Sequence, residues 1–322
     1  MSPTSKSLVI ATRGSRLALA QTSIVAELIR AAHPDVRVDI KTVTTTGDRD
    51  GRPFSAIGGK GLFTSEVERS IVEGAADVAV HSAKDLTSEL APGCAIVCVP
   101  ERGSVEDVVV GGIGKGGEER LASLPEGATV GTSSMRRRAL LAEARPDLEV
   151  RELRGNLDTR LRKVADGELD AAILAAAGID RLHEGTRAGG ALTADWWVPA
   201  PGQGALAIEA LESRADLIDL LSPLEDPIAR VELTAERAFA ARLEGGCSVP
   251  LGCLARANGD GLIVTGFLGS LWGTGNLRDR ASGARREAAQ LGAELADAIL
   301  AAGGDEILAD VREANPPQPV EP

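Results

Sequence analysis

Two segments of this 322-residue chain repeat one order of elements, and this repeat constrains the fold more than any other feature. In residues 8–33 and 128–144, an apolar strand pattern leads through a polar turn with hydroxyl side chains into a helix pattern. Each copy later reaches the sequence Gly-x-x-Asp and a short apolar strand, at residues 74–80 and 167–173. Strands that alternate with helices are typical of parallel sheets. The sequence therefore predicts two similar α/β lobes in series, hinged so that they close over a ligand.

The first lobe is predicted to begin with a strand at residues 8–11 and a helix in which Leu17, Gln21, Ile24 and Leu28 share one face. Its other expected elements are a strand at 36–43, a mobile loop at 44–61, a helix at 62–73 and a buried strand at 76–80. In the second lobe we expect strands at 128–131 and 148–153 and helices at 135–144 and 158–164.

The chain is expected to cross between the lobes twice, at residues 99–103 and again just before a strand at 206–209. A third region follows, with a helix that starts at Asp226-Pro227 and runs to Leu243, a strand at 261–269 and a helix at 287–300. We predict three domains: 1–101 together with 203–222 (α/β), 102–202 (α/β), and 223–322 (a small α+β domain with a disordered tail).

The composition is that of a globular protein whose core is built from small aliphatic side chains, because 43% of the residues are hydrophobic but only 2% are aromatic. The net charge of −12 argues against general nucleic-acid binding. Residues 130–187 nevertheless contain slightly more basic than acidic residues. This local balance indicates either solvated helix faces or a basic cleft for a small polyanion.

Histidine and cysteine usage narrows the chemistry. With three histidines we expect no metal site, and we interpret His81 as a structural residue at a strand end. The four cysteines form no C-x-x-C pair, which argues against a disulfide framework. Residues 58–61 do not fit the phosphate-loop motif. Without a signal peptide pattern or an apolar run of about 20 residues, we expect a cytoplasmic protein with no membrane partner.

Lys84 and Asp85 lie a few residues beyond the predicted buried strand, at its carboxyl end, where open α/β sheets bind their ligands. The pair could be a surface ion pair of little energetic value. We favour a functional carboxylate that Lys84 keeps ionised.

Three consecutive arginines, residues 136–138, open a predicted helix, although the positive end of the helix dipole disfavours cations there. That arrangement is more favourable if the arginines face an anion. Arg154 and Arg160 follow within the same lobe, and guanidinium groups bind carboxylates through paired hydrogen bonds. We therefore predict a site for carboxylates in the second lobe.

Cys247 follows two glycines at the expected end of a helix. Glycines allow the left-handed conformations that end helices, so the thiol is expected on a turn. The residues alone leave two interpretations open: a small buried side chain, which is common for free cysteine, or an exposed reactive thiol.

Five ordered motifs closely resemble the porphobilinogen deaminase (hydroxymethylbilane synthase) family. They are His81-Ser82-Ala83-Lys84-Asp85, residues 131–137 (Gly-Thr-Ser-Ser-Met-Arg-Arg), Arg154-Gly155-Asn156, Gly202-Gln203-Gly204 and residues 243–250 (Leu-Glu-Gly-Gly-Cys-Ser-Val-Pro). The resemblance spans nearly the whole chain. It implies two lobes like those of hinged periplasmic binding proteins, a third domain, and a monomer. It also implies a transferase that joins four porphobilinogen molecules head to tail, with release of ammonia, into hydroxymethylbilane for tetrapyrrole biosynthesis.

The resemblance also implies a dipyrromethane cofactor, made from substrate and bound covalently through Cys247. Asp85 matches the catalytic carboxylate, which would stabilise the cation left when ammonia departs. The other residues that match cofactor-binding positions are Ser82, Lys84, Thr132, Ser133, Ser134, Arg136 and Arg137. Those that match substrate-binding positions are Arg13, Ser15, Lys60, Arg154, Arg160, Arg181 and Gln203.

Some positions depart from the family pattern, namely Ala56, Ala83 and Leu86-Thr87, and Phe63 matches an aromatic that could stack on the cofactor or pack in the core. Two other classes of function remain as alternatives. One is a two-lobed carboxylate-binding protein without catalysis, which the absence of a secretion signal disfavours. The other is a thiol-dependent acyl transferase with Cys247 as nucleophile, which no nearby histidine supports.

Overall fold

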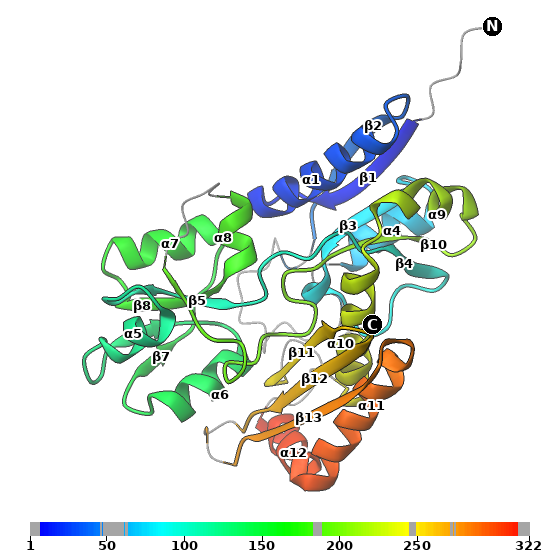
Figure 1. Ribbon diagram of the computed structural model, residues 1–322. Coiled ribbons are helices and arrows are strands. Elements are labelled where there is room, and N and C mark those ends of the chain that lie inside the picture. The colour runs from blue at the N-terminus through cyan, green and yellow to red at the C-terminus, as the bar shows by residue number, and fades with distance from the viewer. Residues whose placement is uncertain are drawn as a thin grey trace, which may run out of the picture.

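Three β-sheets organise the chain in the computed structural model (Figure 1), which describes residues 7–45, 47, 61, 64–182, 189–244, 249–270, 273 and 275–314. Two sheets have five strands each and belong to the first and second lobes, and the third has three strands. The fold class predicted from the sequence, two α/β lobes with a small α+β domain, is confirmed by these sheets.

The sheet of the first lobe has the strand order β2-β1-β3-β10-β4. The strands are β1 (Ser7–Arg13), β2 (Arg37–Val43), β3 (Val78–Ser82), β4 (Cys94–Cys98) and β10 (Leu206–Leu211). The first three are parallel to one another, whereas β10 runs antiparallel to both β3 and β4. The strand expected at 206–209 therefore does return to the first lobe.

The sheet of the second lobe repeats this order as β7-β6-β8-β5-β9. Its strands are β5 (Asp107–Gly111), β6 (Thr129–Gly131), β7 (Glu149–Arg151), β8 (Ala171–Ala175) and β9 (Gly190–Ala191). Here too the first three strands of the order are parallel, and the fourth is antiparallel to the third. The internal repeat predicted from the sequence is confirmed at the level of topology.

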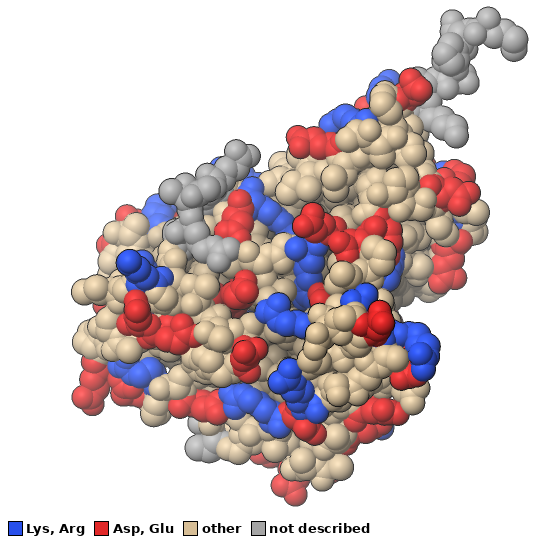
Figure 2. Space-filling model, in the orientation of Figure 1, with Lys and Arg blue, Asp and Glu red and all other residues tan. Residues whose placement is uncertain are grey.

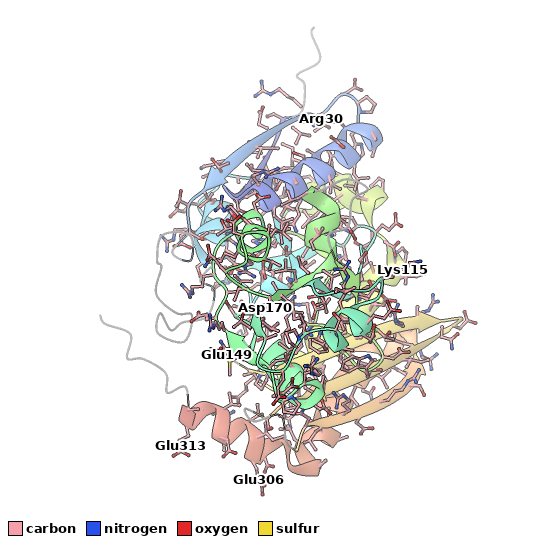
Figure 3. All side chains as sticks on the ribbon, turned by 90° about the vertical axis from the view of Figure 1, so that its left-hand side faces the viewer. Arg30, Lys115, Glu149, Asp170, Glu306 and Glu313 are labelled. Carbon is pink, nitrogen blue, oxygen red and sulfur yellow. The ribbon has the colours of Figure 1, made fainter. Side chains whose placement is uncertain are left out.

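The repeated aspartate has the same role in both lobes. Oδ2 of Asp77 accepts a hydrogen bond from the backbone N–H of Val9, at 2.8 Å. Oδ2 of Asp170 accepts one from the backbone N–H of Thr129, at 2.7 Å, in the equivalent strand. Figure 3 shows Asp170 close to Glu149, which is paired with Thr129 in the neighbouring strand. Each aspartate thus fastens the start of its own strand to the first strand of its lobe.

Helices cover the two lobe sheets. In the first lobe these are α1 (Arg16–Ala32), α4 (Ser65–Val72) and α9 (Ala215–Leu221); in the second they are α5 (Gly117–Ala122), α6 (Met135–Ala144), α7 (Leu157–Ala165) and α8 (Ala176–Leu182). The bounds predicted for α6 are confirmed. Residues 44–61 lie almost wholly outside the described residues.

The core face of α1 differs from the face grouped in the sequence. Ile24 and Leu28 are 37% and 40% exposed, whereas Val25, Ala26 and Ile29 are fully buried. The buried face of the helix is therefore not the face predicted from Leu17, Gln21, Ile24 and Leu28. The buried side is displaced by one position because small and polar residues, including Thr22, also pack against the sheet.

The third domain is an antiparallel sheet, β11-β12-β13, with helices packed on it (Figure 1). Its strands are β11 (Leu251–Asn258), β12 (Gly261–Leu268) and β13 (Leu277–Ala284), and its helices are α10 (Pro227–Arg242), α11 (Ala288–Ile299) and α12 (Asp305–Ala314). Asp226 caps α10, as its sequence predicted, by accepting hydrogen bonds from two backbone N–H groups. The exact domain boundaries stay a prediction. The predicted tail at 315–322 lies outside the described residues.

Candidate active site

The turn after β3 carries Lys84 and Asp85. Residues 83–85 form one turn of 3₁₀ helix, and Ala83 is held by a hydrogen bond from its N–H to the carbonyl of Ala205, at 3.0 Å. Both side chains are half-buried. The strand ends at Ser82, two residues later than predicted, so this turn lies at the carboxyl end of the parallel strands, where ligands bind in such sheets.

A small pocket of about 50 Å³ beside this turn brings together four of the predicted site residues: Arg13, Ser15, Ser82 and Asp85. Gln21 also lines the pocket, and its side-chain amide is hydrogen-bonded to Oγ of Ser82, at 2.8 Å. Gln21 was not predicted as a site residue. The one available signal was that Gln21 is a polar residue on the helix face that we expected to pack against the sheet.

Hydroxyl side chains shape the amino terminus of α6 in the second lobe. Oγ of Ser134 accepts the backbone N–H of Arg137, and Oγ1 of Thr132 accepts that of Ser134. Oγ of Ser133 donates to the carbonyl of Leu153, at 2.5 Å. Ser15 caps α1 in the same way, through the N–H of Ala18. Each lobe therefore presents a helix amino terminus, which favours anions.

Arg136 and Arg137 face an anion, as predicted, but this anion belongs to the protein. Asp107 of β5 is fully buried, and its two carboxylate oxygens lie 2.8 Å from Nη2 of Arg136 and 2.7 Å from Nη2 of Arg137. Trp197 and Gln203 each donate another hydrogen bond to the same carboxylate. Burial opposes ionisation of Asp107, but the two arginines together hold its pKa well below the usual range.

The two arginines retain further donor capacity. Their Nη1 atoms donate to the carbonyls of Val198 and Ile173. Within the described residues, the Nε atoms of Arg136 and Arg137 are buried without a hydrogen-bond partner. Two guanidinium groups share one carboxylate, so this part of the structure carries an excess positive charge.

Other cations surround the same region. The pKa of Lys84 is lowered to about 8, chiefly by burial and then by Arg137, with Asp85 opposing the shift. The pKa of Arg160 is lowered to about 10, again by burial and then by Arg137. Asp85 and Asp107 are too few to neutralise this set. The site is therefore suited to a ligand with several negative charges.

Two further predicted residues make internal contacts. Arg154 pairs with Glu152, whose Oε1 lies 3.0 Å from its Nε atom. Nη2 of Arg181 donates to the carbonyl of Gly204, at 2.6 Å, and burial lowers the pKa of Arg181 to about 10. In Figure 2, Lys and Arg side chains follow the junction between the second lobe and the rest of the molecule.

Gln203 was expected to contact substrate, but the structure places it inside the protein. Its side chain is fully buried; Nε2 donates to the carbonyl of Val105 and to Asp107, and Oε1 lies 3.5 Å from Nζ of Lys84. Gln203 thereby links the turn that bears Asp85 to the second lobe. Contact with substrate stays a prediction.

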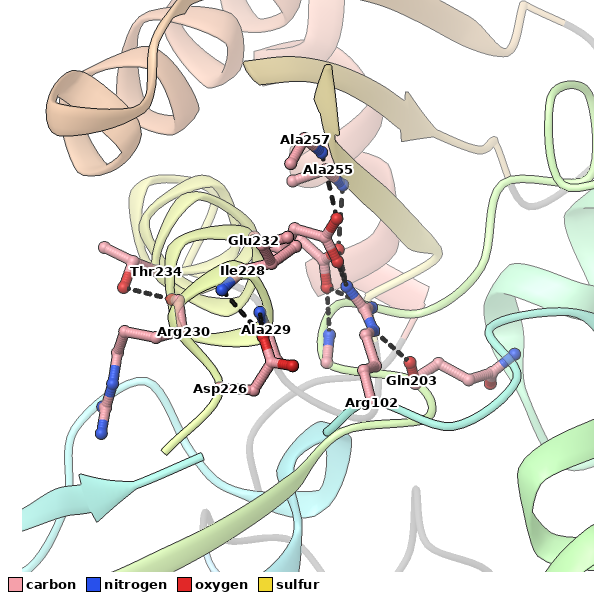
Figure 4. A network of polar contacts seen from close by, with 12 residues as sticks. Arg102, Gln203, Asp226, Ile228, Ala229, Arg230, Glu232, Thr234, Ala255 and Ala257 are labelled. Atoms are coloured by element: carbon pink, nitrogen blue, oxygen red, sulfur yellow. Dashed lines mark hydrogen bonds and ion pairs between the residues drawn. The ribbon is translucent and has the colours of Figure 1, made fainter. Parts of the chain in front are cut away.

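A buried ion pair connects both crossings to the third domain (Figure 4). It was not predicted from the sequence. Arg102, on the first crossing, makes two hydrogen bonds to the carboxylate of Glu236 on α10, at 2.8 and 2.9 Å. The same carboxylate accepts the backbone N–H groups of Gly202, on the second crossing, and Ala255, on β11. Nε of Arg102 also donates to the carbonyl of Gln203.

Cys247 and Lys60 lie outside the described residues, as does Phe63. The chain that leads to Cys247 is described up to Glu244, where φ is +52°. Glu244, one residue before the glycines, thus has a left-handed conformation. The three described cysteines, Cys94, Cys98 and Cys253, are buried free thiols.

In the described residues no group of three or more His, Cys, Asp and Glu side chains could hold a metal ion. His81, which we interpreted as structural, is buried with Nε2 3.0 Å from Oε2 of Glu209. No described helix is long and apolar enough to cross a membrane.

Comparisons with known proteins point to one family over nearly the whole chain. Residues 8–219 match the family model described as porphobilinogen deaminase, dipyromethane cofactor binding domain, and residues 231–301 match that of the C-terminal domain. A porphobilinogen deaminase of Roseiflexus castenholzii is 47% identical over 304 residues, which cover 94% of this chain and 99% of the relative. One of Syntrophus aciditrophicus is 42% identical over 308 residues, which cover 95% and 99%.

Solved structures give a weaker likeness. The periplasmic VFT2 domain of Bordetella pertussis BvgS aligns over 67% of this chain and 84% of its own, with a TM-score of 0.37 and 17% identity. A Salmonella typhimurium periplasmic binding protein with high arginine specificity aligns over 70% and 94%, with a TM-score of 0.38 and 12% identity. Scores this low carry no argument, and the fold rests on the strand order given above.

Proposed function

The chain belongs to the porphobilinogen deaminase family, and on that premise we propose that it joins four porphobilinogen molecules head to tail into hydroxymethylbilane, releasing ammonia at each step. The observation that carries the proposal is the position of Asp85. This carboxylate lies at the carboxyl end of β3 and lines the pocket with Arg13. It also lies near Lys84 and Arg160, in a region with more basic side chains than acidic ones to pair with them.

The residues present fit a dipyrromethane cofactor. The acetate and propionate groups of its two rings would bring four negative charges to a region where the buried Nε atoms of Arg136 and Arg137 have no described partner. Lys84, Ser82, Thr132, Ser133 and Ser134 are proposed to hold it with these arginines. When bound, the cofactor supplies the carbon nucleophile to which the first substrate is joined. We propose Cys247 as the residue that anchors it.

Asp85 is proposed as the catalytic carboxylate. As ammonia leaves the substrate, positive charge develops on the pyrrole, and a fixed carboxylate stabilises it. The same oxygens can accept the pyrrole proton and return one to the departing amine. Besides its proposed contact with the cofactor, Lys84, whose pKa is lowered to about 8, would attract a substrate carboxylate beside Asp85 while it remains protonated.

The remaining cations are proposed to bind the acetate and propionate groups of the substrate. Arg160 adjoins Asp85 closely enough for the carboxylate to affect its pKa, so it is the best placed of them for the reacting ring. The other proposed substrate-binding residues are Arg13, Ser15, Lys60, Arg154, Arg181 and Gln203. We also propose that the protein acts as a cytoplasmic monomer. A carboxylate-binding protein without catalysis is not favoured, because the relatives are named as deaminases.

Intact-mass measurement tests the proposal. The purified wild-type chain should be heavier than its sequence by one covalent dipyrrole, and Cys247→Ser should lack the addition. Cys253→Ala is the matched control, because Cys253 is a buried free thiol in the same domain and its loss should leave the added mass in place. An unmodified wild-type chain with full deaminase activity would contradict the proposal.

A further inference from the structure

A second pocket, outside the candidate active site, lies between the edge of the first lobe and the third domain. Its volume is about 470 Å³, and it is the larger of the two pockets described here. One wall is formed by Ser88 and residues 90–96, which include part of the edge strand β4. The other wall is one face of α10, formed by Arg230, Leu233, Thr234 and Arg237 at helical spacing.

The two arginines of this pocket differ in how their charges are balanced. Arg230 makes two hydrogen bonds to the carboxylate of Glu225, at 2.6 and 3.0 Å, so its charge is neutralised. Arg237 forms no ion pair with any described residue. Its nearest electrostatic compensation comes from Glu209, which is fully buried and lies 3.0 Å from His81.

Arg237 also has donors to spare. Its Nη2 atom donates to the carbonyls of Thr87 and Ser88, at 3.0 and 3.1 Å. Its Nε and Nη1 atoms make no hydrogen bond within the described part of the chain, nor are they among the buried atoms left without a partner. A half-buried guanidinium with open donors on a pocket wall is the arrangement that binds a carboxylate.

The rest of the pocket sets the shape of the ligand. Leu90, Ile96 and Leu233 supply apolar walls beside Arg237, which forms no ion pair with a described residue. A ligand that matches both the guanidinium and the apolar walls must carry one anionic group and an apolar body. We propose that this pocket binds a small organic monocarboxylate, with the carboxylate on Arg237 and the apolar part against these walls.

The pocket is connected to the candidate active site through the chain. Thr87 and Ser88, whose carbonyls Arg237 holds, follow Asp85 by two and three positions. A bound carboxylate would compete for the same guanidinium and change its hold on this segment. We therefore expect the ligand to alter deaminase turnover. That consequence rests on the role proposed for Asp85, whereas binding itself does not.

The test uses 4-fluorophenylacetate as probe, with the cofactor-loaded protein, and measures binding by ¹⁹F NMR titration. The wild type should bind with a Kd on the order of 1 mM, as a ligand of this size allows. Arg237→Met should weaken binding about tenfold or more. Arg256→Met, which removes an exposed arginine on β11, should leave it unchanged. Arg237→Gln, which keeps donors for the Thr87 and Ser88 carbonyls, should also weaken binding if the methionine variant does not fold.

Two outcomes would overturn the proposal. Equal binding to wild type and both Arg237 variants would show that the pocket is not the site. Loss of binding in Arg160→Met instead would place the probe in the candidate active site. Neither result bears on the dipyrrole mass or the deaminase activity of the wild-type protein, so failure here is distinguishable from failure of the proposed function.

Discussion

Arg137 places its Nη2 atom 2.7 Å from Oδ1 of Asp107, so a side chain expected to bind an external carboxylate holds an internal one. Arg136 occupies the other oxygen of the same carboxylate. Asp107 therefore fixes the orientation of both guanidinium groups and neutralises one of their two charges. The remaining charge and the unpartnered Nε atoms are what these residues can offer to a ligand.

Asp107→Asn should destabilise the protein by about 3–5 kcal/mol, because it leaves two buried guanidinium groups without a counter-charge. Urea unfolding at pH 7 measures this, and Asp166→Asn, at an exposed helix end, should change stability by about 0.5 kcal/mol or less. The folded pKa of Asp107 is depressed, so its contribution is present above the unfolded value of about 4 and is lost as the pH falls through the folded value. Equal stability of the two variants would contradict the buried pairing.

Asp85→Asn should lower kcat by about 10²–10⁴-fold while KM changes little, because the amide can neither accept a proton nor stabilise a cation as a carboxylate does. Steady-state kinetics with porphobilinogen measures both constants in protein that already carries the dipyrrole. Asp166→Asn again serves as the control. A kcat within a few-fold of the wild type would remove Asp85 from the catalytic role.

KM for porphobilinogen should rise as the pH increases through about 8, the value to which burial and Arg137 lower the pKa of Lys84. Below that pH the ammonium is charged and attracts a carboxylate; above it the attraction is lost. In Lys84→Arg the guanidinium stays charged, so this rise should disappear from the KM profile between pH 7 and 9. A rise that persists in Lys84→Arg would have to come from another group.

Asp77→Ala and Asp170→Ala should each destabilise the protein by about 0.5–1.5 kcal/mol, since each removes a hydrogen bond that joins two strands. Urea unfolding of the two variants beside Asp35→Ala, an exposed position, measures the effect. If only one of the two substitutions lowered the free energy of unfolding, the two aspartates would not contribute equally to stability, although the two lobes share one topology.

Local patterns were sufficient for much of the fold. The strand before Asp85 and the helix that begins after Ser134 were predictable because apolar runs, turn residues and a capping serine all lie within a few positions of one another. The matched Gly-x-x-Asp sequences predicted the equivalence of β3 and β8 for the same reason. The joint position of Arg13, Ser82 and Asp85 followed from strand order, which places these segments at one edge of the sheet.

The contacts that the sequence could not predict join residues far apart in the chain. Asp107 precedes Arg136 by 29 positions, and Arg102 precedes Glu236 by 134. No periodicity marks such partners, because each aspartate or glutamate resembles the many acidic residues on the surface until tertiary packing buries it. The internal contacts of Gln203 were unpredictable for the same reason: its motif indicated function, but only packing shows that its amide faces Asp107 and Val105.

The place of β10 in its sheet affects how the protein is made. This strand lies between β3 and β4, although it follows β4 in the chain only after the whole second lobe. Until Leu206–Leu211 has emerged from the ribosome, β3 and β4 have no neighbour to join them, and the sheet of the first lobe is incomplete. At typical rates of synthesis the wait is roughly 5–20 s. The second lobe, whose strands are continuous in the chain, can therefore fold before the lobe that precedes it.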